Sequence, residues 1–116
     1  MTRLYISGPV TGKPDDNRVA FSHAQRCLVG AGYVAEIPHD YVPSGTPHED
    51  AMALSVNQMT SCKHSFQLGA TRKRYDGLAL LPGWEQSEGA RLEKAVAEAC
   101  GIPCKTVDEW IEEVEA

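Results

Sequence analysis

The chain has 116 residues, 42% of them hydrophobic, and a formal net charge of −5. This length suits one domain with a single core, spanning residues 1–116, and is too short for two. The acidic balance argues against a general nucleic-acid surface, and no apolar run is long enough to span a membrane. Residues 1–5 lead into a strand-like pattern without the apolar core of a signal peptide, so we expect a cytoplasmic protein.

Strand and helix patterns alternate along the chain. Strands are predicted at residues 3–7, 33–37, 77–81 and 102–105. Helices are predicted at residues 17–31, 46–61 and 87–100, and from residue 106 to near the C-terminus. Residues 62–74 look helical in part, with the basic run 72–74 as a solvated helix face. This alternation predicts right-handed βαβ crossovers and an α/β fold, a doubly wound parallel sheet of about four to five strands with helices on both faces.

Helix ends and helix faces carry signals of their own. Thr46 and Thr106 each precede a glutamate by three residues, which predicts a capping box at two helix starts. The apolar residues of the last two helices predict which sides face the core. These residues are Leu92, Val96 and Ala99 in one helix and Trp110, Ile111 and Val114 in the other.

The cysteines and histidines give no sign of a metal site. Cys100 and Cys104 lack the two-residue spacing of a zinc or redox motif, and Cys27 and Cys62 are isolated. The four histidines are scattered along the sequence. We therefore expect free thiols and no bound metal.

Polar and glycine residues follow three of the predicted strands. Because parallel strands bring their carboxyl ends to one edge, where ligands of open α/β folds bind, we expect these residues to line a ligand site. They are Ser7 and Gly8 after the first strand, His39 and Asp40 after the second, and Gly83 and Trp84 after the third. Trp84 is either a packing residue or a platform on which a nucleobase stacks.

The start of the third helix adds a possible anion site. Ser87 can cap this helix, Gly89 lets a ligand approach the backbone, and the free N–H groups favour a phosphate. Glu93 lies one turn further, on roughly the same side as Gly89. A carboxylate there could attack an anomeric carbon. The alternative is a solvent-facing Glu93 that pairs with Lys94, Arg91 or Lys73.

Three segments together resemble a known family. They are Tyr5-Ile6-Ser7-Gly8-Pro9, residues 14–18 followed by Ala20-Phe21, and residues 79–93, which read ALLPGWEQSEGARLE. These segments are similar to a phage- and bacteria-associated branch of the nucleoside 2-deoxyribosyltransferase-like superfamily. The resemblance covers both ends of the chain and most of its length outside residues 42–74.

The resemblance implies a flavodoxin-like α/β fold and an enzyme that cleaves or transfers N-glycosidic bonds of deoxynucleosides or their monophosphates. It implies Glu93 as nucleophile, Tyr5 beside it as a second catalytic residue, and no cofactor. The substrate contacts that we expect are Ser7, Gly8, Asn17, His39, Asp40, Gly83, Trp84, Ser87 and Gly89. The resemblance also implies a homodimer or higher oligomer, with a small-molecule nucleoside or nucleotide as ligand and neither nucleic acid nor membrane as partner.

One departure from the family leaves an alternative open. Family members carry an aspartate at the start of the helix before the third strand, where this sequence has residues 66–69 without a carboxylate. Either Asp40 or Asp50 substitutes for it, or the ligand differs, or the activity has been lost. A nucleotide-binding protein without turnover is therefore the alternative to an enzyme.

Overall fold

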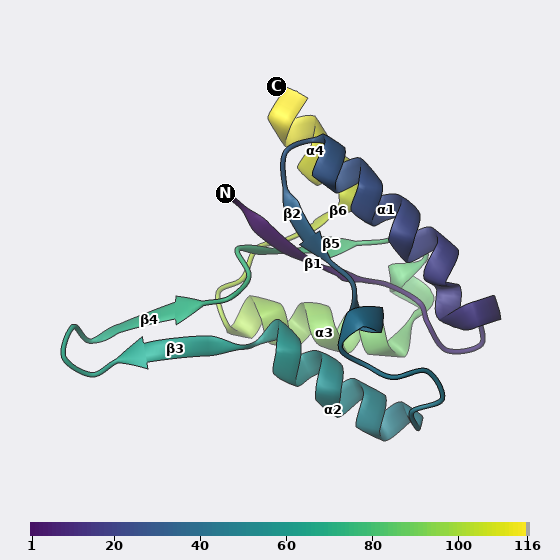
Figure 1. The fold of residues 1–116 in the computed structure, drawn as a ribbon, viewed down its shortest axis with the longest axis horizontal. Helices are drawn as coiled ribbons and strands as arrows, with labels where there is room; N and C mark the ends of the chain where they lie inside the picture. Colours follow the sequence, from purple (N-terminus) through teal and green to yellow (C-terminus); the bar gives the residue numbers. More distant parts are fainter. Residues whose placement is uncertain (116) are drawn as a thin grey trace.

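A computed structural model describes residues 1–115 of the chain. Four parallel strands form the central sheet, and four helices surround it (Figure 1). The strands of this sheet are β1 (Arg3–Ser7), β2 (Val34–Glu36), β5 (Gly77–Leu80) and β6 (Cys104–Thr106). The helices are α1 (Arg18–Gly30), α2 (His48–Met59), α3 (Glu88–Ala99) and α4 (Val107–Glu115). Short 3₁₀ turns lie at Pro14–Asn17, Pro38–Asp40 and Trp84–Gln86.

The sheet has the strand order β2-β1-β5-β6, and every neighbouring pair is parallel. In the central strand, Tyr5 pairs with Glu36 on one side and with Leu78 on the other. The order of the strands reverses at β1, because β2 lies on one side of it and β5 and β6 lie on the other. This is the arrangement of a flavodoxin-like doubly wound sheet, so the predicted fold class is confirmed.

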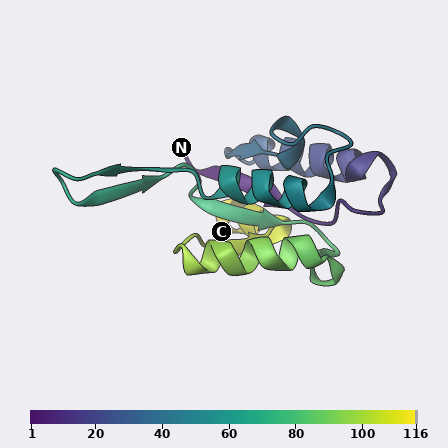
Figure 2. The same ribbon diagram turned by 90° about the horizontal axis from the view of Figure 1, so that it is seen from below.

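Helices cover both faces of the sheet, and each face has its own core (Figure 2). Helices α1 and α4 pack over Leu4, Ile6 and Ala79, while α2 and α3 pack over Tyr5, Leu78 and Leu80. Alternate residues of a strand point to opposite faces, which explains why neighbours such as Tyr5 and Ile6 enter different clusters. The central strands are buried on both faces, β5 along its whole length and β1 from Leu4 onward, as expected in a parallel sheet.

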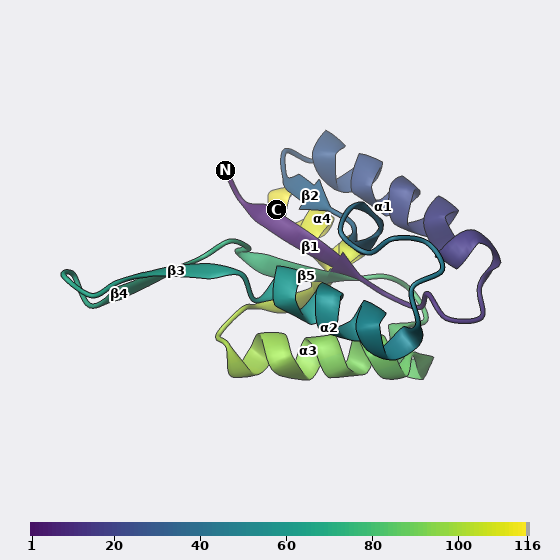
Figure 3. The ribbon, with the colours of Figure 1, turned by 60° about the horizontal axis from the view of Figure 1, so that its bottom comes forward.

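Residues 62–74 do not form the predicted helix. Strands β3 (Cys62–Ser65) and β4 (Ala70–Lys73) form an antiparallel hairpin that projects from the body (Figures 1 and 3). Gly69 adopts the left-handed conformation in the connecting turn, with φ of 61°, which glycine accepts without steric cost. The pair formed by His64 Nδ1 and Thr71 Oγ1, 2.7 Å apart, joins the two strands. The solvated helix face expected for residues 72–74 is therefore wrong as well.

The capping predictions have different outcomes. At α4 the box forms, because Glu109 N–H donates to Thr106 Oγ1 at 3.1 Å and Thr106 N–H donates to Glu109 Oε1 at 2.9 Å. At α2 the prediction is wrong. Thr46 Oγ1 donates instead to the carbonyl of Pro43 at 2.6 Å, and the helix begins after Pro47 without a side-chain cap.

The predicted inward faces of the last two helices are only partly right. In α3, Leu92 and Ala99 are exposed and Val96 alone packs against the core, while the buried residues are Ala90, Glu93 and Ala97. In α4, Trp110 is buried as predicted and Ile111 packs against the core, but Val114 is half exposed. The prediction turned the wrong side of α3 toward the core. The side that faces inward consists of small residues and a glutamate, which do not form an apolar stripe in the sequence.

Candidate functional site

A cleft of about 1180 Å³ opens at the carboxyl ends of β1 and β5. This is the point where the strand order reverses, the usual ligand site of an open α/β sheet. The segments after β1, the loops after β2 and β5, and the first turns of α2 and α3 enclose it. Among the predicted site residues, the lining includes Gly8, Asn17, His39, Gly83, Ser87, Gly89 and Glu93.

Glu93 presents its carboxylate to this cleft from the buried side of α3. Only 6% of the residue is exposed, so the alternative of a solvent-facing glutamate is wrong. Ser7 Oγ, at the end of β1, donates to Glu93 Oε1 at 2.7 Å, and Ser55 Oγ, from α2, donates to Oε2 at 2.5 Å. Three elements distant in sequence therefore meet at one carboxylate.

Tyr5 reaches Glu93 indirectly. Its ring is fully buried in the core, and its hydroxyl lies 2.7 Å from Ser55 Oγ. Because the single proton of Ser55 is donated to Glu93, the tyrosine must be the donor in this second bond. The result is a chain of hydrogen bonds from Tyr5 through Ser55 to Glu93. Tyr5 thus lies near the carboxylate but does not line the cleft.

The ionisation of these groups follows from their burial. Burial raises the pKa of Glu93 above the ordinary range of a glutamate, although the hydrogen bonds from Ser55 and Ser7 oppose the shift. Burial, followed by the negative charge of Glu93, also raises the pKa of the Tyr5 hydroxyl, which keeps its proton. The site therefore holds a carboxylate that accepts a proton unusually readily.

Two glycines in the cleft lining allow close packing. A Cβ atom on Gly8 would lie 2.7 Å from Leu81 Cβ, so the chain after β1 can pass β5 only without a side chain. A Cβ atom on Gly89 would lie 3.0 Å from Met52 Sδ, so the missing side chain leaves room for Met52 where α3 faces α2. Ser55, on the same helix as Met52, lies within hydrogen-bond distance of Glu93.

The loop after β1 is held in an unusual conformation. Asp15, Asp16 and Asn17 all have positive φ, between 49° and 60°, where side chains other than glycine are strained. Asn17 Nδ2 donates to the Pro9 carbonyl at 2.8 Å, and His39 Nε2 lies 2.8 Å from the Asp16 carbonyl. Because a carbonyl only accepts, His39 carries its proton on Nε2. Nδ1 of the same ring is buried and has no hydrogen-bond partner in the part of the chain that the structure describes.

Three predicted substrate contacts lie outside the cleft lining. Ser7 is buried and contacts Glu93 rather than the open cleft. Asp40 is exposed, and Trp84 packs against the core beneath α3, with Lys94 Nζ 5.6 Å from its ring centre. The packing alternative describes Trp84. Asp50, offered as a substitute for the family aspartate, is exposed and also lies outside the lining.

The comparison with the family aspartate rested on the wrong segment. Residues 66–69 form the tip of the hairpin, and the helix before β5 is α2. The group that α2 directs at Glu93 is Ser55, which the sequence reasoning missed. The sequence offered one signal for it. Ser55 lies four positions before Met59, on the same face of α2, and both residues are buried.

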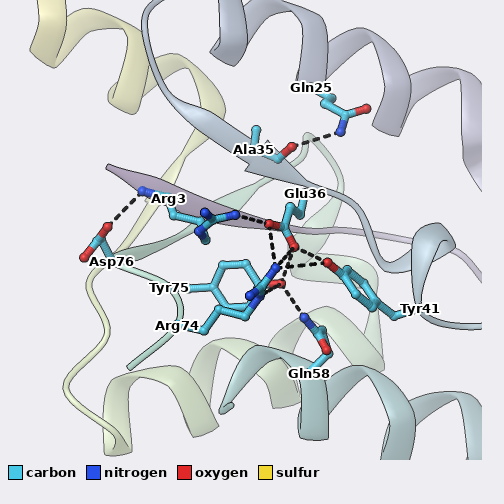
Figure 4. Close-up of polar contacts among 9 residues, drawn as sticks. All are labelled: Arg3, Gln25, Ala35, Glu36, Tyr41, Gln58, Arg74, Tyr75 and Asp76. Atoms are coloured by element: carbon cyan, nitrogen blue, oxygen red, sulfur yellow. Dashed lines mark hydrogen bonds and ion pairs between the residues drawn. The ribbon is translucent and has the colours of Figure 1, made fainter. Parts of the chain in front are cut away.

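A second polar cluster, also missed, surrounds Glu36 at the end of β2 (Figure 4). Its carboxylate accepts hydrogen bonds from Tyr75 OH at 2.8 Å and Arg74 Nη2 at 3.1 Å, and from Tyr41 and Arg3. Burial alone would raise the pKa of Glu36, but these four donors lower it to about 2. The Tyr75 ring contacts the Tyr5 ring, with centroids 5.1 Å apart, so the cluster adjoins the site.

Two further features bear on ligands and partners. Within residues 1–115, no group of three or more His, Cys, Asp or Glu side chains is arranged to hold a metal ion. None of the helices in that range is long and apolar enough to cross a membrane.

Comparison with known proteins gives one match. The model of a family described as "Domain of unknown function (DUF4406)" matches residues 2–106. No curated protein and no solved structure matches the chain.

Proposed function

This chain belongs to the DUF4406 family, and we propose that it cleaves or transfers the N-glycosidic bond of a nucleoside or nucleoside 5′-monophosphate. The observation that carries the proposal is the buried carboxylate of Glu93, held by two hydroxyls and presented to a cleft at the switch point of the sheet. The resemblance of residues 5–9 and 79–93 to the nucleoside 2-deoxyribosyltransferase-like superfamily supports the same assignment.

The proposed reaction is a double displacement. A Glu93 oxygen attacks C1′ of the sugar through an oxocarbenium-like transition state, the C1′–N bond breaks, and the base leaves with a proton. Water, or a second base, then attacks C1′, loses a proton, and frees the carboxylate. Ser7 and Ser55 hold the carboxylate in one orientation, and each of its oxygens keeps a lone pair for the reaction. These steps need no cofactor.

The remaining cleft residues have proposed roles in binding. The start of α3, capped by Ser87 through the Ala90 N–H at 3.1 Å, is suited to the 5′-phosphate. Lys13 is a cation in the same lining. Asn17 and His39 hold the loop that covers the sugar and base. All four cysteines are free thiols, which fits a reducing compartment, so the proposal includes a cytoplasmic location.

The test is release of free base from a panel of ribo- and deoxyribonucleosides and their 5′-monophosphates, followed by chromatography. Glu93→Gln keeps the shape of the side chain and removes its charge, so we expect turnover to fall by at least about a thousandfold. Glu98→Gln is the matched control, because Glu98 lies on the same helix but is exposed and outside the cleft lining. Full activity of Glu93→Gln, or equal loss in both variants, would overturn the assignment.

The covalent step has a separate readout. Rapid quenching during turnover, followed by intact mass spectrometry, should show the protein with one added glycosyl group. Peptide mapping should place the group on residues 88–99, and Glu93→Gln should show none. Turnover without any adduct in the wild-type protein would favour direct attack by water.

One observation favours a second candidate, a protein that binds a nucleotide without turning it over. Burial raises the pKa of Glu93, and a protonated carboxyl group cannot act as a nucleophile. Equilibrium dialysis with the same panel, together with chromatography of the recovered ligand, separates the two candidates. Tight binding with no base released over long incubation would favour the binding protein.

A further inference from the structure

The β3–β4 hairpin, called here the arm (Cys62–Lys73), projects from the body near the amino ends of β1 and β5 (Figures 1 and 3). The cleft lies at the opposite, carboxyl ends of these strands. At its root, the Arg74 N–H donates to the Ser61 carbonyl at 2.8 Å. Almost every side chain of the arm is exposed, including Phe66 at 91% and Leu68 at 82% in its tip. The arm therefore presents two large apolar side chains to solvent at the end of a ribbon.

The arm gains little stability from the rest of its own chain. Its two strands contact each other extensively, while the four-stranded sheet is separate from it. An isolated two-stranded hairpin is marginally stable in water, because it buries little apolar area. Both outer edges also leave backbone N–H and C=O groups unpaired. A surface that covers the tip would stabilise the arm.

The charge of the arm differs from that of the body. Residues 60–75 hold four of the eleven Lys and Arg residues of the chain and none of its sixteen Asp and Glu. In the part of the chain described here, Lys63, Arg72 and Lys73 form no ion pair, while Arg74 pairs with Glu36. Since the rest of the chain is strongly acidic, the positive charge of the arm is complementary to the negative charge on the body of a second copy of the chain.

Helix α4 supplies a matching surface. Its exposed residues are mostly acidic, and within residues 1–115 Asp108, Glu112 and Glu115 form no ion pair. Val114 is 52% exposed among them. The helix thus offers an apolar side chain surrounded by negative charge, while the arm offers apolar side chains surrounded by positive charge.

We infer that the arm docks on the exposed face of α4 of a second copy of this chain, and that two such contacts close a symmetric dimer. Phe66 and Leu68 lie against Val114, and Lys63 and Arg72 face Glu112 and Glu115. In a two-fold dimer each arm meets the α4 helix of the other copy, so both contacts form at once and no open filament results. The cleft stays accessible, because the arm leaves the opposite end of the sheet. This inference does not depend on the proposed reaction.

The experiment is sedimentation velocity over a concentration series, at low and high salt. The wild-type protein should dimerise, and added salt should weaken the dimer. The double variant Phe66→Ser/Leu68→Ser should raise the dimer dissociation constant about tenfold or more. The matched control is Val19→Ser, because Val19 is 80% exposed on α1, away from both surfaces. Circular dichroism should show that the body of each variant remains folded.

A charge exchange identifies the receiving surface. Lys63→Glu/Arg72→Glu and Glu112→Lys/Glu115→Lys should each weaken the dimer by a similar factor. Mixing the two variants should restore a dimer that contains one copy of each, because both contacts then join opposite charges. A wild-type protein that stays monomeric, or a mixture that does not pair, would overturn the inference. So would tight binding of labelled duplex DNA or RNA that Lys63→Glu/Arg72→Glu abolishes, since it would give the arm a different partner.

Discussion

The charged form of Glu93 is disfavoured by burial and favoured by two hydrogen bonds. Removing a carboxylate from water disfavours its charge, while hydroxyl donors at 2.7 and 2.5 Å favour it. Burial is the larger effect, so the pKa is raised. A raised pKa makes the ionised carboxylate a stronger base and a better nucleophile, provided that the solution pH is high enough to remove its proton.

We predict that base release increases as pH rises through the pKa of Glu93 and then reaches a plateau. Ser55→Ala removes a donor to the charged form, so the rising limb should move upward by about one pH unit. Ser61→Ala, at an exposed serine, is the control and should leave the limb in place. Carbon NMR titration of the Glu93 carboxyl group measures the same shift without turnover. An unchanged titration in Ser55→Ala would contradict the role given to Ser55.

Glu36 shows the opposite balance, since its four donors outweigh burial and lower its pKa from 4.5 to about 2. The folded state therefore binds its proton less readily than the unfolded state. This contribution to stability is complete above about pH 4.5 and is lost as pH falls through about 2. The difference corresponds to about 3 kcal/mol.

We predict that Glu36→Gln lowers the free energy of unfolding at pH 7 and reduces its loss between pH 5 and pH 2. Urea unfolding at several pH values measures both effects. Glu98→Gln is the control, because Glu98 forms an exposed pair with Lys94 and should leave the pH dependence unchanged. An acid transition of the same size in Glu36→Gln and in the wild type would contradict the prediction.

At the scale of elements, the loop after β1 stores strain beside the cleft. Three successive residues with positive φ cost about 1–3 kcal/mol each, and the Asn17 and His39 hydrogen bonds hold them there. Strain at this place has a physical consequence, because it fixes the backbone that borders the cleft. These hydrogen bonds offset part of the conformational cost.

We predict that Asp15→Gly raises the free energy of unfolding by about 0.5–1 kcal/mol, because glycine accepts the φ of 49° without steric cost. The matched control is Asp50→Gly, the same change in the first turn of α2, which should destabilise by about 1 kcal/mol. Urea unfolding of both variants checks the opposite signs. Equal destabilisation would show that the loop is not strained.

Two Thr-x-x-Glu segments with the same spacing show how far local sequence determines a helix cap. Thr106 and Glu109 form the reciprocal bonds because the chain enters α4 directly from β6. Thr46 instead donates to Pro43, because the preceding turn offers a carbonyl before the helix begins.

The arm was not predicted from the sequence, for a different reason. The side chains of both its strands are almost all exposed, so the sequence there does not alternate between apolar and polar residues. Hydrophobic periodicity therefore could not indicate a strand.

At the scale of the whole molecule, the alternation of strands and helices was enough to predict the parallel sheet and its ligand edge. The same rule placed Gly8, Gly83 and Glu93 in the lining of one cleft, with Ser7 bonded to Glu93 beneath it, because strand ends meet there. Ser55 could not be placed this way. Its contact with Glu93 depends on how closely α2 packs against α3, which is a property of the folded chain and not of the local sequence.

The position of the arm has a consequence for how such a protein can change over generations. The arm leaves and rejoins the body between α2 and β5, at the end of the molecule away from the carboxyl end of β1. Insertions, deletions or new side chains there alter neither the order of the sheet nor the groups around the cleft. Substitutions in the arm can therefore accumulate independently of substitutions around Glu93, and the reverse also holds.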